Sequence, residues 1–134
     1  MITKGKDYFS LTQSQKSKIK KIIYENLKKN PKVKMAFLYG SFIDRSYFQD
    51  IDVAIIGKLT MNELMDLKLE LSKKTGFEVD IKCFSSLNEI PEPFKFSILH
   101  GELLKKGRRE DFESYKHESI LRYIDFLEFR SKRW

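Results

Sequence analysis

The chain has 134 residues with a net charge of +7; 41% of its residues are hydrophobic and 34% are charged. This balance is typical of one folded domain, here 1–134, and excludes a disordered chain. The sequence has no apolar run long enough for a membrane helix and no hydrophobic leader. Its single cysteine, Cys83, excludes an internal disulfide. We therefore expect a cytoplasmic protein without membrane contact.

An amphipathic helix is predicted over about 12–30. Apolar residues recur there at spacings of three and four, Thr12 or Ser14 can cap the start, and Asn30-Pro31 ends it. Much of the positive charge lies in and just after this segment, in Lys16, Lys18, Lys20, Lys21, Lys28, Lys29, Lys32 and Lys34. We interpret these lysines as the solvated face of a helix, with attraction of phosphates, RNA or an acidic protein surface as the alternative. Few aromatic residues interleave with them, so nucleic acid is not indicated as the main ligand.

Two strands joined by a polar loop follow the first helix. Residues 33–39 form a compact apolar run that stops at Gly40, and residues 50–56 form a second run closed by Gly57. The loop of residues 41–49 between them has room for one helical turn.

The second half of the chain alternates helices and strands. Thr60 and Glu63 form a capping box for a helix whose apolar residues are Leu64, Leu67, Leu69 and Leu71 and which Gly76 ends. A half-buried strand is predicted over 77–84, a short helix over 94–100, an edge strand over 101–106 and a long helix over about 110–130. This order predicts an α+β fold, a small mixed sheet with flanking helices and a core over about 33–106.

Three aspartates are predicted to gather at one end of this sheet. Side chains alternate along a strand, so Asp50 and Asp52 point to one face, and Asp80 lies on the polar face of the later strand. Like charges this close repel one another unless a cation lies between them. Carboxylate oxygens suit Mg²⁺ or Mn²⁺, which keep positions open for water and for the phosphates of a substrate.

Gly40 and Ser41 supply the second part of the predicted site. A glycine after a strand lets the backbone approach a phosphate, and the serine hydroxyl with adjacent amides can donate hydrogen bonds to it. A phosphate-binding turn next to metal-binding carboxylates points to nucleotide chemistry, with Asp50 and Asp52 holding the ions and Asp80 helping to activate an attacking hydroxyl.

The order Gly-Ser, loop, Asp-x-Asp and later Asp resembles the minimal nucleotidyltransferases of the DNA polymerase β-like superfamily. Gly40, Ser41, Asp50, Asp52 and Asp80 match that pattern. The resemblance implies a nucleotidyltransferase fold, ATP or another nucleoside triphosphate as donor, and two Mg²⁺ ions, with Mn²⁺ as an alternative. It also implies transfer of a nucleoside monophosphate to a hydroxyl, with the three aspartates as metal ligands and catalytic groups.

The loop is where the chain departs from this pattern. Residues 42–49 leave eight positions between Ser41 and Asp50, fewer than is typical of the family. Arg45, the counterpart of the family's nucleotide-binding loop arginine, comes one residue later than usual. Asp44 is interpreted as a turn residue outside the site.

Small members of the superfamily resemble the antitoxin halves of pairs with a HEPN-domain ribonuclease toxin, whose tyrosine they adenylylate. The segment Tyr123-Ile-Asp125-Phe126 is similar to the ending of such antitoxins, although packing aromatics would look the same. The resemblance thus implies a HEPN toxin as partner. Two alternatives stay open: a non-catalytic antitoxin of the same fold, and an enzyme that modifies a small molecule such as an aminoglycoside.

Two further points concern the ends of the chain and its assembly. Arg109 and His117 are too far apart for the HEPN Arg-His motif, so the chain is not itself expected to be the toxin. The apolar side of the last helix makes a homo-oligomer one way to cover that surface.

Overall fold

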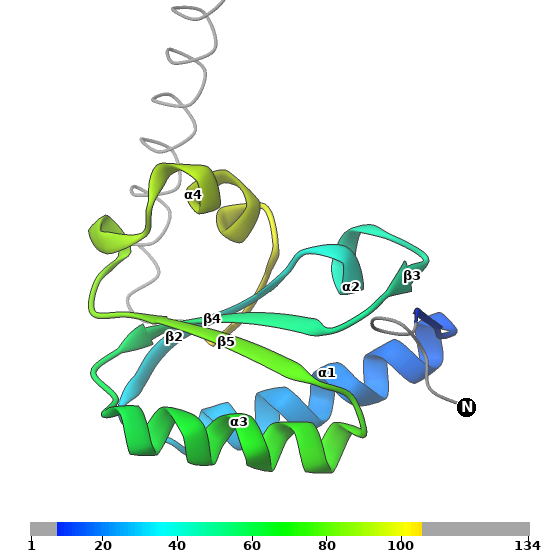
Figure 1. Cartoon of the computed structure of the whole chain (residues 1–134), viewed down its shortest axis with the longest axis horizontal. Helices are drawn as coiled ribbons and strands as arrows, with labels where there is room; N and C mark the ends of the chain where they lie inside the picture. The colour runs from blue at the N-terminus through cyan, green and yellow to red at the C-terminus, as the bar shows by residue number, and fades with distance from the viewer. Residues whose placement is uncertain (1–7, 106–134) are drawn as a thin grey trace, which may run out of the picture.

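The computed structural model describes residues 8–105, which form a sheet with helices on both faces (Figure 1). The predicted helix over 110–130, together with Arg109, His117 and Tyr123 to Phe126, lies outside the described residues. Among the helices of the described range, none combines the length and the hydrophobicity that crossing a membrane requires.

The main sheet has four strands in the order β5, β4, β2, β6. Strand β2 (Val33–Tyr39) runs antiparallel to β4 (Ile51–Gly57) and to the edge strand β6 (Glu102–Lys105). Strand β5 (Val79–Phe84) runs parallel to β4, with the helix α3 in the crossover between them. The sheet is therefore mixed, as predicted, and its two central strands are the two that flank the polar loop.

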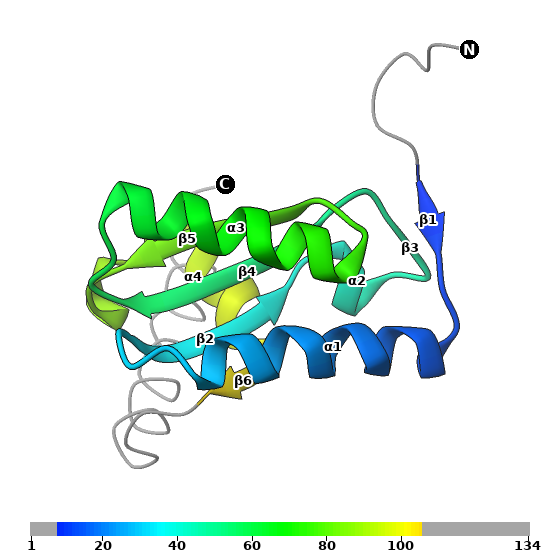
Figure 2. The same cartoon turned by 90° about the horizontal axis from the view of Figure 1, so that it is seen from below.

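Two capped helices cover one face of the sheet, side by side (Figure 2). Helix α1 (Gln13–Lys28) begins with a capping box of Thr12 and Gln15, and α3 (Met61–Thr75) begins with the predicted box of Thr60 and Glu63. In each box the threonine side chain and the residue three positions on satisfy two backbone amides that a helix start leaves unpaired. Gly76 ends α3 in a left-handed conformation, with φ of 80°.

The core has a part on each face of the sheet. Under α1 and α3 it is built from apolar side chains such as Ile23, Leu27, Val53, Ile55 and Leu71, all with 0% exposure. Leu67 and Leu71 of α3 are buried, whereas Leu69 is 65% exposed because it lies about 200° around the helix from each of them. Of the leucines named for this helix, Leu69 therefore lies on its exposed side.

The opposite face is covered by α4 (Glu92–Leu99), which follows a short 3₁₀ turn (Leu87–Glu89). Met35, Phe37, Tyr39, Ala54, Ile56, Ile90 and Ile98 pack together there.

The polar loop is shaped by pairing with the start of the chain, which was not predicted. It contains the expected helical turn, α2 (Ser41–Asp44), followed by a short strand β3 (Tyr47–Phe48). Strand β3 pairs antiparallel with β1 (Phe9–Ser10). Phe48 is fully buried, and its ring meets that of Phe42 edge-on at 4.9 Å between centroids. The shortened loop is therefore an ordered, packed segment.

Candidate active site

A row of three polar side chains crosses the middle strands of the sheet. Tyr39 of β2 lies opposite Asp52 of β4, and Asp52 lies opposite Asp80 of β5. Residues opposite one another on neighbouring strands project from the same face, and Tyr39 packs with Phe37 beneath α4. The row therefore lies on the α4 face, and the predicted neighbourhood of the two acidic strands is confirmed.

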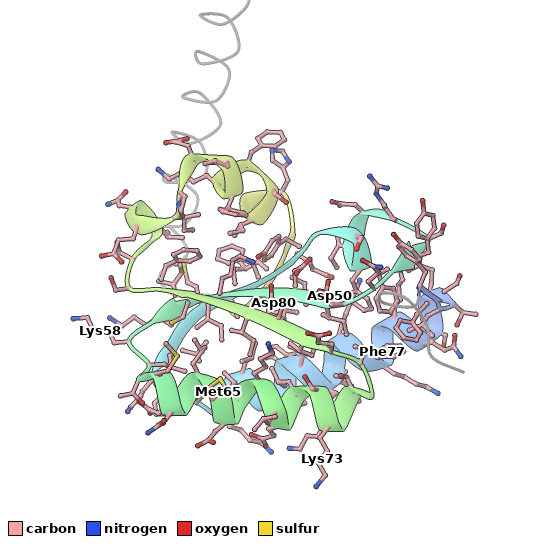
Figure 3. The ribbon with its side chains drawn as sticks, in the orientation of Figure 1. Asp50, Lys58, Met65, Lys73, Phe77 and Asp80 are labelled. Atoms are coloured by element: carbon pink, nitrogen blue, oxygen red, sulfur yellow. The ribbon has the colours of Figure 1, made fainter. Side chains whose placement is uncertain are left out.

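Asp50 lies just before β4, at the same end of the sheet as the row. The amide of Ile51 donates to the carbonyl of Glu78 at 2.9 Å and so joins the start of β4 to the start of β5. Figure 3 shows Asp50 and Asp80 in the same part of the sheet. Within residues 8–105, no three or more histidine, cysteine, aspartate or glutamate side chains are grouped closely enough to hold a metal ion. The structure brings Asp52 and Asp80 together, and a metal site that includes all three carboxylates stays a prediction.

Gly40 holds the end of β2 against the carboxylate of Asp52. Its φ of 81° and ψ of −160° lie in a region that is essentially restricted to glycine. A Cβ at this position would overlap Oδ2 of Asp52 and lie 3.3 Å from its Cγ. The Gly-Ser turn and the second acid therefore touch. The backbone then enters α2 at Ser41, where the amides of a first helical turn can face an anion.

The turn is anchored from below by a buried lysine, Lys16 of α1. Its side chain is 4% exposed, and Nζ donates to the carbonyl oxygens of Phe42 and Arg45, both at 2.8 Å. The ammonium also lies 5.3 Å from the ring centroid of Phe42 and 5.9 Å from that of Phe48. A charged group is buried at acceptable cost only when its donors are satisfied in this way.

The interpretation of Lys16 as part of a solvated helix face is therefore wrong. The other lysines of that run are exposed or, for Lys20, half-buried. Spacing would have distinguished Lys16 from them, because it precedes Ile19 by three residues and so shares the face of Ile19 and Ile23.

Arg45 and Asp44 are both exposed on the outside of the turn. Arg45 caps the end of α2, with its amide bonded to the carbonyl of Ser41 at 2.9 Å. Its backbone is thus held at both ends, while its side chain points away from the packed part of the loop. Its predicted role in nucleotide binding stays a prediction.

Lys82 lies beside Tyr39 and Asp80, and it was not among the predicted site residues. Its Nζ lies 3.2 Å from Oδ2 of Asp80 and 5.5 Å from the ring centroid of Phe94 in α4. Burial tends to lower the pKa of Lys82, but Asp80 and Tyr39 together outweigh it, so that this pKa is raised. The signal in the sequence was its spacing, since Asp80 and Lys82 are two residues apart on one face of a strand.

The hydroxyl of Tyr39 is the buried polar atom of this region. It lies close to the Lys82 ammonium but makes no regular hydrogen bond to any described residue. Burial is the main reason that the pKa of Tyr39 is raised; the charge of Lys82 opposes this effect, and those of Asp52 and Asp80 add to it. Tyr39 therefore stays neutral near pH 7, as a phenol between one cation and two acids.

Comparison with known proteins assigns the chain to a family. A family model described as polymerase beta, nucleotidyltransferase matches residues 18–110, more than two thirds of the chain and a span that includes all six predicted site residues. Among curated protein sequences there is no match.

Several solved structures share the fold. The first is a chain from a tri-AMPylated Shewanella oneidensis HEPN toxin in complex with MNT antitoxin, with a TM-score of 0.57, 22% identity and coverage of 91% of this chain and 94% of that one. The second comes from a toxin-antitoxin with AMP-PNP, with a TM-score of 0.57, 20% identity and coverage of 91% and 94%. The third comes from the toxin-antitoxin MntA-HepT, with a TM-score of 0.56, 21% identity and coverage of 90% and 94%. At such low identities the likeness concerns the fold alone.

Proposed function

Because this chain belongs to the polymerase beta nucleotidyltransferase family, we propose that it transfers AMP from ATP to a hydroxyl group, and that the acceptor is a tyrosine of a partner HEPN toxin. The observation that carries this proposal is the contact between the Gly40 turn and Asp52, in register with Asp80. It combines a close-approach backbone turn with paired carboxylates, which is what phosphoryl chemistry on a nucleotide requires.

Gly40 and Ser41 are assigned to the triphosphate. The space that a Cβ of Gly40 would fill is occupied by the carboxylate of Asp52, so the acid lies against the turn. The Ser41 hydroxyl and the amides at the start of α2 can donate hydrogen bonds to a phosphate oxygen beside it. Lys16 keeps this turn in place through the carbonyls of Phe42 and Arg45. Arg45 is assigned to the outer phosphates, which its exposed guanidinium can contact from the edge of the turn.

Asp50, Asp52 and Asp80 are assigned to Mg²⁺, with Mn²⁺ as a substitute. Asp52 and Asp80, which lie opposite each other, offer the carboxylate oxygens that such an ion prefers, and the first of them lies against the phosphate turn at Gly40. The addition of Asp50 to this pair is part of the proposal. When bound, divalent ions would neutralise the phosphates and the leaving group.

The proposed reaction is an in-line displacement at the α-phosphorus of ATP. The tyrosine oxygen forms a new bond to that phosphorus, the bond from phosphorus to the bridging oxygen breaks, and pyrophosphate leaves with the bonding electrons. The proton of the tyrosine hydroxyl passes to the carboxylate of Asp80, which is 40% exposed at its side chain and therefore reachable by an acceptor from outside. We expect this reaction in the cytosol, where ATP is available.

The partner is proposed from the fold neighbours. The structures with the same fold include a tri-AMPylated HEPN toxin with its MNT antitoxin and a toxin-antitoxin with AMP-PNP.

The deciding experiment is transfer of label from radioactive ATP, GTP, CTP or UTP to the protein encoded by the neighbouring gene, with Mg²⁺ present. We expect AMP on a tyrosine, located by mass spectrometry, and loss of transfer in Asp52→Asn and Asp80→Asn. Asp66→Asn on α3, outside the predicted site, is the matched control and should keep full transfer.

The same experiment separates the alternatives. If Asp52→Asn neutralises the toxin as well as the unmodified chain does and no label is transferred by either, the protein is a binding antitoxin and the catalytic proposal is wrong. Transfer of label to an aminoglycoside, with none to the neighbouring protein, would instead identify a small-molecule enzyme.

A further inference from the structure

Lys82 occupies a place where a cation is needed, among the acids of the candidate site. Asp52 and Asp80 lie opposite each other on parallel strands, and like charges in that position destabilise a sheet. The Lys82 ammonium meets Oδ2 of Asp80 at 3.2 Å. From its position two residues along β5, Lys82 therefore supplies positive charge to this pair of acids in the protein without nucleotide.

The surroundings of Lys82 hold its side chain over the site. It lies opposite Ala54 in the sheet register, a small residue of the cluster beneath α4. Its ammonium faces the ring of Phe94 from α4 at 5.5 Å, an arrangement in which a cation is attracted to the aromatic face. The buried Tyr39 hydroxyl is the third group beside it. One carboxylate, one ring and one phenol thus surround the ammonium.

We propose that Lys82 is a positioning residue that acts as an internal counter-ion for Asp80 and competes with the divalent cation for this carboxylate. The inference rests on the proposed function, since it takes Asp80 to be a metal ligand. An ammonium and a divalent cation cannot both lie against one carboxylate oxygen without strong repulsion. Where the ion binds Oδ2 of Asp80, Lys82 therefore leaves that oxygen, and its ammonium is then available to the negatively charged triphosphate.

Two consequences follow for the protein without nucleotide. Removing the charge of Lys82 should make cation binding tighter, because the competitor is gone. Removing the carboxylate of Asp80 should abolish this gain in cation affinity, because Lys82 and the metal then no longer compete for one ligand. A residue that served only the packing of β5 would produce neither effect.

The test is a titration of the full chain with Mn²⁺ in the absence of nucleotide. Binding is measured by electron paramagnetic resonance as the loss of the signal of free Mn²⁺. We expect Lys82→Met to lower the Kd for Mn²⁺ by about three- to tenfold, since a divalent ion feels roughly twice the effect of a single exposed charge pair. Lys82→Arg, which keeps the charge, should bind Mn²⁺ as the unmodified chain does.

Two controls make the result specific. Lys73→Met removes the same charge from α3, on the far side of the sheet (Figure 3), and should leave the Kd unchanged. In the Asp80→Asn background, Lys82→Met should no longer tighten binding, which a double-mutant cycle would measure.

Equal Mn²⁺ affinity in Lys82→Met and the unmodified chain, with both binding the ion, would overturn the counter-ion role and leave the proposed function standing. Absence of Mn²⁺ binding from every variant, Lys82→Met included, would overturn the metal-dependent function and this inference with it.

Discussion

The backbone at Gly40 and the carboxylate of Asp52 occupy adjoining space, so that a Cβ on Gly40 would overlap Oδ2 of Asp52. The contact joins the turn that follows β2 to an acid of the neighbouring antiparallel strand β4. A side chain at Gly40 would have to displace either the phosphate-binding turn or the acid, and both are assigned to the reaction.

We therefore expect Gly40→Ala to lower AMP transfer by about a hundredfold or more, because a shift of about 1 Å at a reacting group has that effect. The variant should also lose stability, since its backbone conformation strains any residue with a Cβ. Transfer assays and urea unfolding measure the two effects.

Gly76→Ala is the matched control for this prediction. Gly76 has nearly the same φ, 80°, but a Cβ there would meet nothing within 4 Å. It should lose about 1 kcal/mol of stability from the left-handed backbone and keep its transfer activity. Equal activity in the two variants would contradict the assigned contact between Gly40 and Asp52.

Lys16→Met tests the anchor beneath the turn. Methionine keeps the length and apolar stem of the side chain but removes the donor to the carbonyls of Phe42 and Arg45. We expect the free energy of unfolding to fall by about 1–3 kcal/mol, the usual effect of leaving buried acceptors unpaired. Lys18→Met, on the exposed side of the same helix, should change stability by less than about 0.5 kcal/mol. Equal unfolding midpoints for both variants would show that Lys16 does not anchor the loop.

Tyr39→Phe tests the buried hydroxyl in the polar row. This oxygen makes no regular hydrogen bond to the described residues and lies close to the Lys82 ammonium. The gain from removing an unpaired hydroxyl and the loss of its contact with Lys82 oppose each other, so the free energy of unfolding should change by less than about 1 kcal/mol. Phe37→Leu, a truncation two residues earlier in the same cluster, is the control and should destabilise by about 1 kcal/mol or more. A clear loss of stability in Tyr39→Phe would mean that the hydroxyl has a partner in solution.

Glu63 is expected to make the stability of the protein depend on pH in the acid range. Its side-chain hydrogen bond to Lys32, followed by its bond to the Thr60 backbone, lowers the pKa of Glu63 from 4.5 to about 2. A group whose pKa is lower in the folded chain binds fewer protons there, so its contribution is present above pH 4.5 and is lost as the pH falls towards 2.

The corresponding variant is Glu63→Gln. We expect it to have a lower unfolding temperature than the unmodified chain at pH 7, and a difference that shrinks as the pH is lowered through the acid range. Glu89→Gln, in the 3₁₀ turn outside this capping box, is the control, and its difference in unfolding temperature from the unmodified chain should not follow this pH dependence. A difference that stays constant with pH would contradict the assignment of the low pKa to Glu63.

Local signals were sufficient for most elements of the fold. Strand β2 has the bounds predicted from its apolar run, α3 begins at the predicted cap Thr60, and α1 begins at Thr12, one of its two predicted caps. Alternation along β5 correctly separated Val79 and Ile81 from Asp80 and Lys82. These features depend on residues within a few positions of one another, so a single sequence contains them.

Contacts between distant segments were harder to predict. The pairing of β1 with β3 joins residues far apart in the chain through strands of two residues each, too short for a period to appear. Lys16 donates to carbonyls 26 and 29 positions further along the chain, and the residues next to it in the sequence do not indicate those partners.

The sequence by itself determined the chemistry available to this protein: a glycine and serine after one strand, and acids at alternating positions of two others. Only the tertiary structure decided which of these groups touch. It placed Asp52 against Gly40 and between Tyr39 and Asp80, brought Lys82 to the carboxylate of Asp80, and buried Lys16 beneath the turn. The physical reason is that residue type and spacing act locally, whereas the register of the strands and the burial of a side chain depend on the packing of the whole sheet.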